Sequence, residues 1–155
     1  SAVITMDGDG QHKVEDVVSF EKAYRRNKNI SIWVGKRKIK GTDMPFMRRI
    51  TNISMSILIS LFSLQWIPDT QNGFRLIKRD VIRNVTLITS KFETESELLI
   101  KAGWKMYRIG SVPISTVYSK EKSKINPTRD TIRFFRMLLI ILFPLLMKVK
   151  LWKKN

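Results

Sequence analysis

The sequence predicts an α/β fold, and three features of its first part carry that prediction. A short apolar run at residues 3–6 breaks into acidic residues and glycines, as a buried strand does where it opens into a loop. Residues 14–26 place apolar side chains at helical spacing, and residues 30–34 form a β-rich run. Strand, helix and strand within about thirty residues indicate a βαβ unit, so we expect a parallel sheet.

The rest of the chain supplies further elements. We expect helices over residues 45–64, 92–103 and 130–151, a short strand at 74–77 and an extended segment at 105–118. Gly103 is expected to cap the second of these helices at its C-terminus. Pro113 has no backbone N–H, so it predicts an edge strand or a bend.

Two of the expected helices are unusually apolar. The helix at 45–64 carries Arg48 and Arg49 and is then apolar on nearly all sides, so it is either buried or lies in a membrane interface; we favour the interface. Residues 137–147 are uncharged and apolar, but fall short of the roughly twenty that span a bilayer. Basic residues and a tryptophan around them are typical of an interfacial anchor, with a truncated transmembrane region as the alternative.

The charge of the chain predicts an anionic partner. Lys and Arg number 29 against 13 Asp and Glu, a net charge of +16, which suits phosphates, an acidic membrane surface or nucleic acid. The sequence contains no cysteine, which excludes disulfides and thiolate metal sites. It enters a strand directly after Ser1 without an initiator methionine, so we expect an earlier portion to be missing.

The acid and glycine cluster after the first strand suggests a metal site. Asp7 and Asp9 lie two residues apart, so an extended backbone points both carboxylates the same way, and Gln11 adds an uncharged oxygen. Such oxygen donors suit Mg²⁺ or Mn²⁺ bridging to a diphosphate. A plain turn is the alternative. A calcium loop is excluded, because its sixth and twelfth positions hold His12 and Val18 instead of Gly and Glu.

Polar groups elsewhere fit a phosphate-rich ligand. The loop at 35–41 carries four positive charges beyond the second strand, where ligands of open α/β sheets bind. Phosphate binding is favoured there over a solvated loop or a nucleic-acid patch. Residues 69–73 form a turn by their chemistry, and acidic residues at 93–97 suit a helix N-terminus. For Asp69 and Glu97, a cap or a helix-dipole partner is therefore the alternative to a catalytic role.

The motifs together resemble one family. They are Asp-Gly-Asp-Gly-Gln-His at 7–12, Gly-Lys-Arg at 35–37, Asp-x-x-Asn-Gly-Phe-Arg at 69–75, Glu-Ser-Glu-Leu-Leu-Ile at 95–100, Val-Pro-Ile at 112–114 and Ser-Lys-Ile at 123–125. In this order the chain resembles the dolichol-phosphate mannose synthase and polyprenyl-phosphate glycosyltransferase branch of the family 2 glycosyltransferases. The resemblance implies a partial GT-A fold with a Rossmann-like mixed sheet, a nucleotide-sugar donor, Mg²⁺ or Mn²⁺, and a polyprenyl-phosphate or cell-envelope glycan acceptor at the cytoplasmic membrane face.

The resemblance also implies roles for individual residues. The metal ligands would be Asp7, Asp9 and Gln11. The catalytic residues would be Glu95, as the general base, and Asp69. The residues that bind substrate would be Arg37, Arg48 or Arg49, Gly73, Arg75, Ser123 and Lys124. A lipid phosphate, largely ionised at neutral pH, needs little help to attack, whereas a sugar hydroxyl needs Glu95 as a base.

The sequence departs from the family pattern in two places, one on the nucleotide side and one on the acceptor side. The family's first, nucleotide-binding strand has no counterpart, and Tyr118 and Glu121 replace an arginine and a glycine on the acceptor side. We expect residues 1–126 to be the C-terminal part of a GT-A domain and 127–155 a membrane-interface or pre-transmembrane helix. A non-catalytic basic membrane-surface or nucleic-acid-binding module is the alternative, although no nucleic-acid partner is expected.

Overall fold

The computed structural model describes residues 1–8, 10, 12–37, 46–91, 93–115 and 127–152. The elements in chain order are β1 (Ala2–Thr5), the 3-10 turn η1 (Val14–Asp16), α1 (Val17–Arg26), β2 (Ile30–Arg37), α2 (Phe46–Ser63), β3 (Arg75–Lys78), α3 (Arg79–Asn84), α4 (Glu93–Trp104), β4 (Arg108–Ile114) and α5 (Pro127–Trp152). The predicted α/β class is confirmed, and the short helix α3 is an addition to the predicted elements.

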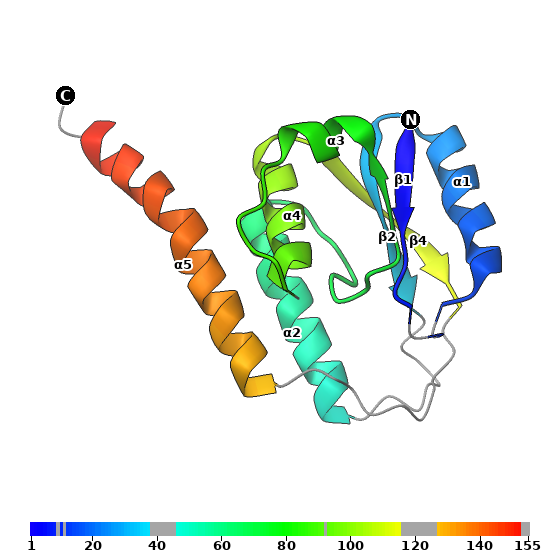
Figure 1. Cartoon of the computed structure of the whole chain (residues 1–155), viewed down its shortest axis with the longest axis horizontal. Coiled ribbons are helices and arrows are strands. Elements are labelled where there is room, and N and C mark those ends of the chain that lie inside the picture. The colour runs from blue at the N-terminus through cyan, green and yellow to red at the C-terminus, as the bar shows by residue number, and fades with distance from the viewer. Residues whose placement is uncertain (9, 11, 38–45, 92, 116–126, 153–155) are drawn as a thin grey trace.

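The four strands form one mixed sheet in the order β1-β3-β2-β4 (Figure 1). β3 pairs antiparallel with both β1 and β2, while β2 and β4 are parallel. β1 and β2 therefore run in the same direction, as a helical crossover requires, but they are separated by β3. The expectation of a sheet that is parallel throughout is wrong, whereas the mixed sheet implied by the resemblance is present.

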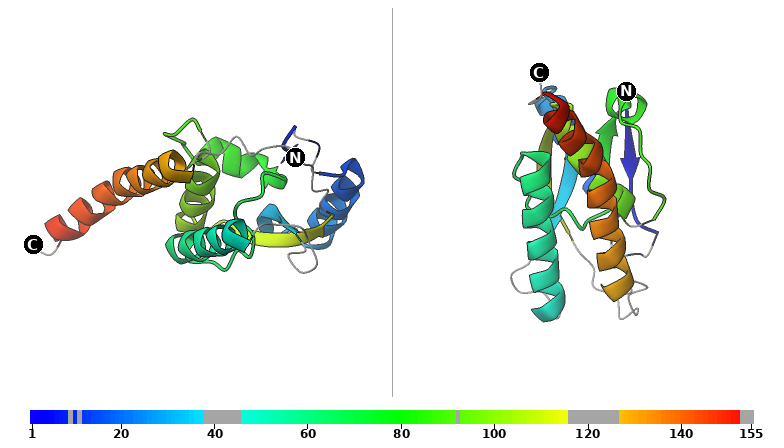
Figure 2. Two further views of the ribbon diagram at one scale, coloured as in Figure 1. Left: turned by 90° about the horizontal axis from the view of Figure 1, so that it is seen from below. Right: turned by 90° about the vertical axis from the view of Figure 1, so that its left-hand side faces the viewer.

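Helices cover the two faces of the sheet differently (Figure 2). Side chains alternate along a strand, so Trp33 and Leu76 pack with Phe20 of α1 in one cluster. Their neighbours Ile32 and Ile77 face the other way and join the larger core formed with α2 and α4. The sheet thus lies between one helix on one side and a layer of helices on the other.

Proline and glycine in the second half of the chain illustrate how packing decides local structure. Pro113 lies in β4, which is an edge strand as predicted. Gly103 does not cap α4, because the helix continues to Trp104, and the left-handed residue after it is Met106 with φ 61°. A Cβ on Gly103 would collide with the Ser63 carbonyl of α2, so close helix packing is what requires the glycine.

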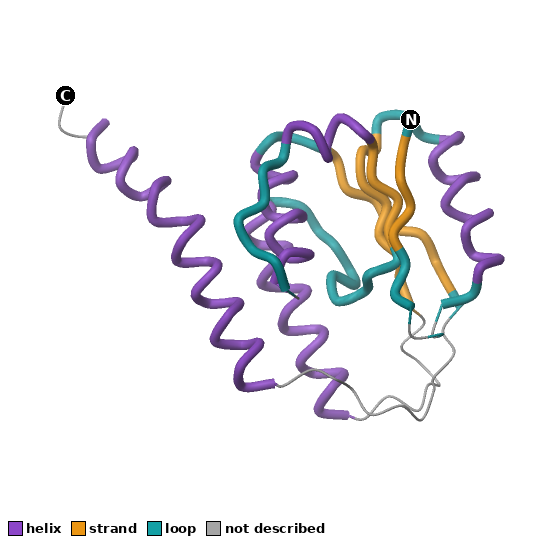
Figure 3. The backbone as a smooth tube through the Cα atoms, viewed as in Figure 1, coloured by secondary structure: helices purple, strands orange, loops and turns teal. Residues whose placement is uncertain are grey.

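The outer face of α2 is apolar and exposed, while its inner face is buried. Ser56, Ile59, Ser60 and Ser63 lie inside, and the exposed apolar side chains are Phe46, Met47, Ile50, Ile53, Ile57 and Leu61. The inner serines anchor the loop at residues 64–74: Ser60 Oγ accepts from Ile67 N at 2.9 Å and Ser56 Oγ from Thr70 N at 3.0 Å. This loop runs back between α2 and the sheet toward β3 (Figure 3).

The last helix, α5, packs on the domain through side chains between Phe134 and Leu142. Phe134, Met137, Leu138 and Ile141 are buried in the core shared with α4. Its C-terminal part extends beyond the body of the domain (Figures 1 and 2). Among the helices that the structure describes, none has both the length and the apolar character that a membrane span requires. The division of the chain at residue 127 into two functional parts stays a prediction.

Candidate active site

The turn at residues 69–73 is fixed rigidly to the end of β2. Asn72 Nδ2 donates to the Gly35 carbonyl at 2.8 Å, and the Asn72 side-chain oxygen accepts from Phe74 N at 3.0 Å. A Cβ on Gly35 would lie 2.8 Å from Asn72 Nδ2, so glycine permits this close approach. The amide of Gly35 also donates to the Phe74 carbonyl at 2.9 Å. The asparagine of the Asn-Gly motif therefore joins the turn to the sheet.

Asp69, predicted to be catalytic, is paired with Arg37, predicted to bind substrate. Arg37 Nε and Nη2 each donate to a different Asp69 carboxylate oxygen at 2.8 Å, and the Arg37 amide donates to the same carboxylate at 3.2 Å. The Asp69 side chain is only 4% exposed. This bidentate pair joins the end of β2 to the loop. The predicted catalytic role of Asp69 and the predicted substrate-binding role of Arg37 stay predictions, and the structure shows that the two residues stabilise the loop.

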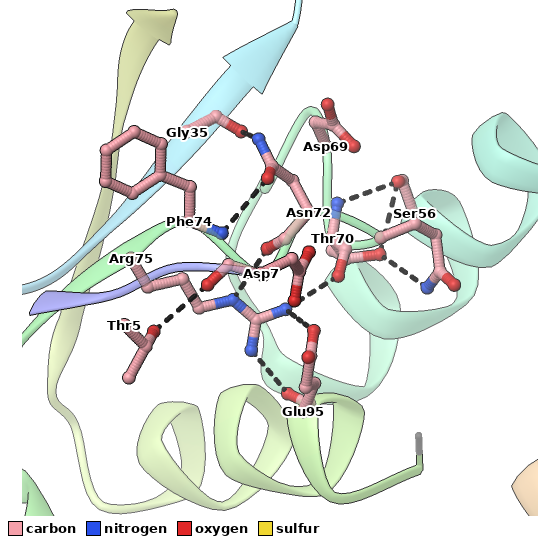
Figure 4. Close-up of polar contacts among 12 residues, drawn as sticks. Thr5, Asp7, Gly35, Ser56, Asp69, Thr70, Asn72, Phe74, Arg75 and Glu95 are labelled. Atoms are coloured by element: carbon pink, nitrogen blue, oxygen red, sulfur yellow. Dashed lines mark hydrogen bonds and ion pairs between the residues drawn. The ribbon is translucent and has the colours of Figure 1, made fainter. Parts of the chain in front are cut away.

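Arg75 is buried, and its guanidinium reaches from the loop at 69–74 to Glu95 of α4 (Figure 4). Its guanidinium donates to the carbonyls of Asn72 at 3.0 Å, Thr70 at 2.9 Å and Glu95 at 3.1 Å. Its Nη2 also pairs with Glu95 Oε2 at 2.9 Å. Burial lowers the pKa of Arg75, and the nearby carboxylates of Glu95 and Asp7 oppose that effect. Arg75 thus fixes the loop and Glu95 from below instead of presenting its charge to solvent.

Asp7 follows the end of β1 and rests directly on Gly73. A Cβ on Gly73 would lie 2.6 Å from Asp7 Oδ2, so any larger residue would displace the carboxylate. Thr5 Oγ1 donates to the Gly73 carbonyl at 3.0 Å and holds the two segments together. Gly73 was predicted to bind substrate. In the structure its missing side chain leaves the space that the Asp7 carboxylate occupies.

The Asp7 carboxylate is ionised and partly open to solvent. His12 lowers its pKa most, through a contact of Nε2 with Oδ2 at 3.4 Å, and partial burial acts in the opposite direction. The charge of Arg75 and the amide of Gly73 lower the pKa further, so the net value is below the ordinary 3.8. The Asp7 side chain is 49% exposed. Asp7 is thus a carboxylate that keeps its charge at neutral pH and stays accessible.

A pocket of about 170 Å³ opens beside Asp7. Its polar lining comes from Thr5, Asp7, Arg75, Thr94 and Glu95, and its apolar lining from Met6, Ile77, Leu87 and Leu98. The structure thereby brings Asp7, Gly73, Arg75 and Glu95, which lie far apart in the sequence, to one cavity. Neither Arg48 nor Arg49, both on the first turns of α2, belongs to this described lining.

The two glutamates that sequence reasoning did not distinguish have different environments. Glu95 lines the pocket, and its side chain is 42% exposed. Glu97 is fully buried: it pairs with Lys101 and accepts from the amides of Ile88 and Thr89, each at 2.9 Å. Burial alone would raise the pKa of Glu97, but these donors together hold it below its ordinary value. Glu97 fixes the segment that carries Leu87, whereas Glu95 faces the ligand space.

The fit of a divalent cation rests on Asp7. An ionised, accessible carboxylate is the donor that Mg²⁺ or Mn²⁺ prefers, and Asp7 meets both conditions. Within the described residues, no group of three His, Cys, Asp or Glu side chains is arranged to hold a metal. The predicted ligands Asp9 and Gln11 lie outside the described residues, as do the predicted acceptor residues Ser123 and Lys124. The chemistry of the described donor fits the cation.

Some lining residues were given no role by the sequence. Leu87 lies in the loop after α3 and Leu98 on α4, and only the fold brings them together at the pocket. His12, the single histidine of the chain, was part of the motif at 7–12 but was assigned no role, and the structure places it beside Asp7.

Comparison with known proteins gives consistent relatives. The chain is 30% identical over 146 residues to the UDP-N-acetylglucosamine–dolichyl-phosphate N-acetylglucosaminyltransferase of Methanococcus voltae, covering 88% of this chain and 57% of that protein. It is 28% identical to a dolichyl-phosphate hexose transferase of Haloferax volcanii, covering 81% and 54%. It is also 28% identical to a dolichol-phosphate mannosyltransferase of Pyrococcus furiosus, covering 79% and 36%.

These relatives agree in the acceptor that their names give and differ in the sugar. No family model matches the chain. The chain spans about half the length of the first two relatives, 57% and 54%. The resemblance drawn from the motifs is confirmed: the chain is a relative of the dolichyl-phosphate glycosyltransferases.

Proposed function

We propose that the full-length protein transfers a sugar from a nucleotide-sugar donor to a polyprenyl phosphate at a membrane surface. The observation that carries this proposal is the placement of an ionised, accessible Asp7 at a pocket whose wall also holds Glu95. The names of the relatives support the acceptor class, since all three act on a dolichyl phosphate.

Asp7 would hold the cation together with Asp9 and Gln11. When bound, Mg²⁺ or Mn²⁺ neutralises the negative charge that develops on the departing nucleoside diphosphate. The chain's own contribution is to keep Asp7 charged and in place: Gly73 supports the carboxylate from below, and the buried Arg75 adds a positive charge nearby. Because contacts within the chain hold Asp7 in this arrangement, little reorganisation is needed on binding.

Glu95 would face the acceptor. Its ion pair with Arg75 at 2.9 Å orients the carboxylate at the pocket wall. With a lipid phosphate, which is largely ionised at neutral pH, the attacking oxygen needs no strong base, so Glu95 would contribute little to the rate as a base. With a glycan hydroxyl, Glu95 would have to accept the proton. The contribution of Glu95 to the rate therefore reports on the acceptor.

The outer faces of α2 and α5 would contact the membrane. Exposed apolar side chains recur along α2 at helical spacing, and α5 adds Ile132, Phe135, Leu139 and Phe143. The sequence of α2 contains two arginines and no acidic residue, and the whole chain carries a net charge of +16. Apolar stripes with basic residues and few acids suit an anionic lipid surface.

A transfer assay tests the proposal. Membranes from cells that express the full-length protein would be supplied with radiolabelled nucleotide sugars, dolichyl phosphate and Mn²⁺, and the label in extracted lipid would be counted. We expect labelled lipid that disappears with EDTA and in Asp7→Asn. Glu21→Gln is the matched control, since Glu21 is an exposed carboxylate paired with Arg25 on the surface of α1. Full labelling in Asp7→Asn would contradict the proposal.

A further inference from the structure

His12 is enclosed although it lies in a loop next to the accessible Asp7. Its side chain is only 5% exposed, against 49% for Asp7. The ring packs on Phe74, with centroids 5.1 Å apart and an interplanar angle of 51°. Phe74 in turn packs on Phe20 of α1, with centroids 4.7 Å apart. The imidazole is therefore held by the core, and its orientation is fixed independently of Asp7.

Only one of the two ring nitrogens has a polar partner among the described residues. Nε2 lies 3.4 Å from Asp7 Oδ2, whereas Nδ1 is buried without a hydrogen-bond partner there. A buried polar atom without a partner costs about 1–3 kcal/mol. A hydrocarbon side chain would fill the space on Phe74 without that cost, so packing alone does not account for a histidine at this position.

The contact acts on the proposed metal ligand. Gly73 lies beneath the Asp7 carboxylate, and His12 approaches one of its two oxygens from the side of Phe74. The backbone amide of Gly73 already favours the ionised Asp7, and His12 adds a second contact, from a side chain, at Oδ2. Hydrogen bonds to ligating carboxylates orient them, and removing such partners typically costs about 10–100-fold in metal affinity.

We propose that His12 is a positioning residue: its Nε2–H donates to Asp7 Oδ2 and fixes the carboxylate so that the other oxygen is available to a divalent cation. This inference rests on the proposed function, since it assumes that Asp7 holds the cation. The 3.4 Å contact is long for a hydrogen bond, and such contacts often shorten once the ligand is in place. His12 itself contacts neither cation nor substrate in this role.

Binding of Mn²⁺ alone, followed by electron paramagnetic resonance, tests the inference on three variants of the full-length protein. His12→Phe keeps the packing on Phe74 and removes the donor, so we expect Mn²⁺ affinity to fall about 10–100-fold. His12→Gln places an amide N–H near the position of Nε2, and we expect it to restore most of the affinity. Asp7→Asn should abolish the tight binding.

The outcomes separate this inference from the proposed function. If the wild-type protein binds Mn²⁺ no better than Asp7→Asn, the metal role of Asp7 is wrong and the inference is overturned with it. If the wild-type protein binds Mn²⁺ tightly and His12→Phe binds equally well, only the inference about His12 is overturned. A directly coordinated histidine nitrogen in the spin-echo spectrum of bound Mn²⁺ would likewise overturn it, because His12 would then be a ligand.

Thermal unfolding of each variant shows whether a loss of binding reflects a loss of fold. His12→Leu serves as a second variant without a donor should His12→Phe fail to fold. A folded variant that lacks the donor and binds Mn²⁺ weakly, together with recovery in His12→Gln, supports the positioning role. Equal weakening in His12→Gln and in the variants without a donor would contradict it.

Discussion

Two polar regions meet at the pocket, and they differ in how completely their groups are paired. In the loop at 69–75, Asp69 and Arg75 are nearly inaccessible and bonded on several sides. In the segment that follows β1, Asp7 is half exposed, and its contact with the His12 side chain is long, at 3.4 Å. The first region is completed by the fold, while the second keeps bonding capacity for a ligand.

The difference teaches which charged residues serve the fold and which serve a ligand. A buried charge without its partner is costly, so an enclosed ion pair is bonded from all sides and acts as a scaffold. An accessible charge that the fold leaves partly unpaired can bind something else at little extra cost. By this criterion Arg37, Asp69, Arg75 and Glu97 build the site, whereas Asp7 and Glu95 face the ligand.

The largest effect on stability is expected for Arg75→Met. This change leaves the carbonyls of Asn72, Thr70 and Glu95 without their donor, and each buried acceptor left unpaired costs about 1–3 kcal/mol in the free energy of unfolding. Denaturant unfolding measures the loss. The control Arg25→Met removes an exposed pair with Glu21, worth less than about 1 kcal/mol. Equal effects of the two changes would remove the distinction between scaffold and surface.

Asp7→Asn should reverse this pattern, with a large effect on activity and a small one on stability. The amide keeps the shape of the side chain but loses the charge, so sugar transfer should fall by about 10²–10³-fold or more. The free energy of unfolding should change by less than about 1 kcal/mol, because the side chain is 49% exposed. A strongly destabilised variant would mean that Asp7 belongs to the scaffold.

Glu97→Gln should lower the free energy of unfolding by an intermediate amount that depends on pH. In the folded protein the pKa of Glu97 is below 4.5, its ordinary value in an unfolded chain. The ionised carboxylate therefore stabilises the fold fully above pH 4.5. This stabilisation is lost as the pH falls from 4.5 through the lower pKa of the folded state. The variant should be less stable by about 1–3 kcal/mol at pH 7. Unfolding curves across pH should show the gap narrowing below pH 4.5. A gap that widens in acid would contradict this role.

The smallest effect on stability is expected on the outer face of α2. Ile57→Ser should change the free energy of unfolding by less than about 0.5 kcal/mol, as surface substitutions usually do. It should also weaken binding to anionic vesicles several-fold, since partial burial of an aliphatic side chain in the lipid is worth about 1 kcal/mol. Ile82→Ser on α3 is a matched control, because Ile57 and Ile82 are both 49% exposed. Equal vesicle binding by the two variants would argue against α2 as the lipid-facing element.

Local sequence patterns predicted the elements better than their arrangement. The periodicity of residues 14–26 and 45–64 predicted α1 and α2 closely, because helical spacing is a local property. Strand order is not local, so nothing in the β1, α1 and β2 segments shows that β3 inserts between the two strands. For the same reason Gly103 was expected to end a helix, whereas its true constraint is the Ser63 carbonyl of another helix.

For the site, the sequence predicted chemistry but not pairing. The motif resemblance selected Asp7, Gly73, Arg75 and Glu95, and the structure brings all four together at one pocket. Distinguishing Glu95 from Glu97 required knowing which side of α4 faces the pocket and which faces the segment at 88–89. The pairing of Asp69 with Arg37 depends on two segments more than thirty residues apart, and no spacing rule reveals it.

Anomalous diffraction from crystals of the protein soaked with Mn²⁺ and a nucleoside diphosphate tests most directly whether Asp7 is a metal ligand. Data collected at the manganese edge would locate the ion without reference to any assumed chemistry. We expect an anomalous peak within coordinating distance of an Asp7 carboxylate oxygen, beside the pocket that Glu95 lines. An ordered nucleotide with its manganese elsewhere, and an Asp7 carboxylate without a ligand, would contradict the central claim.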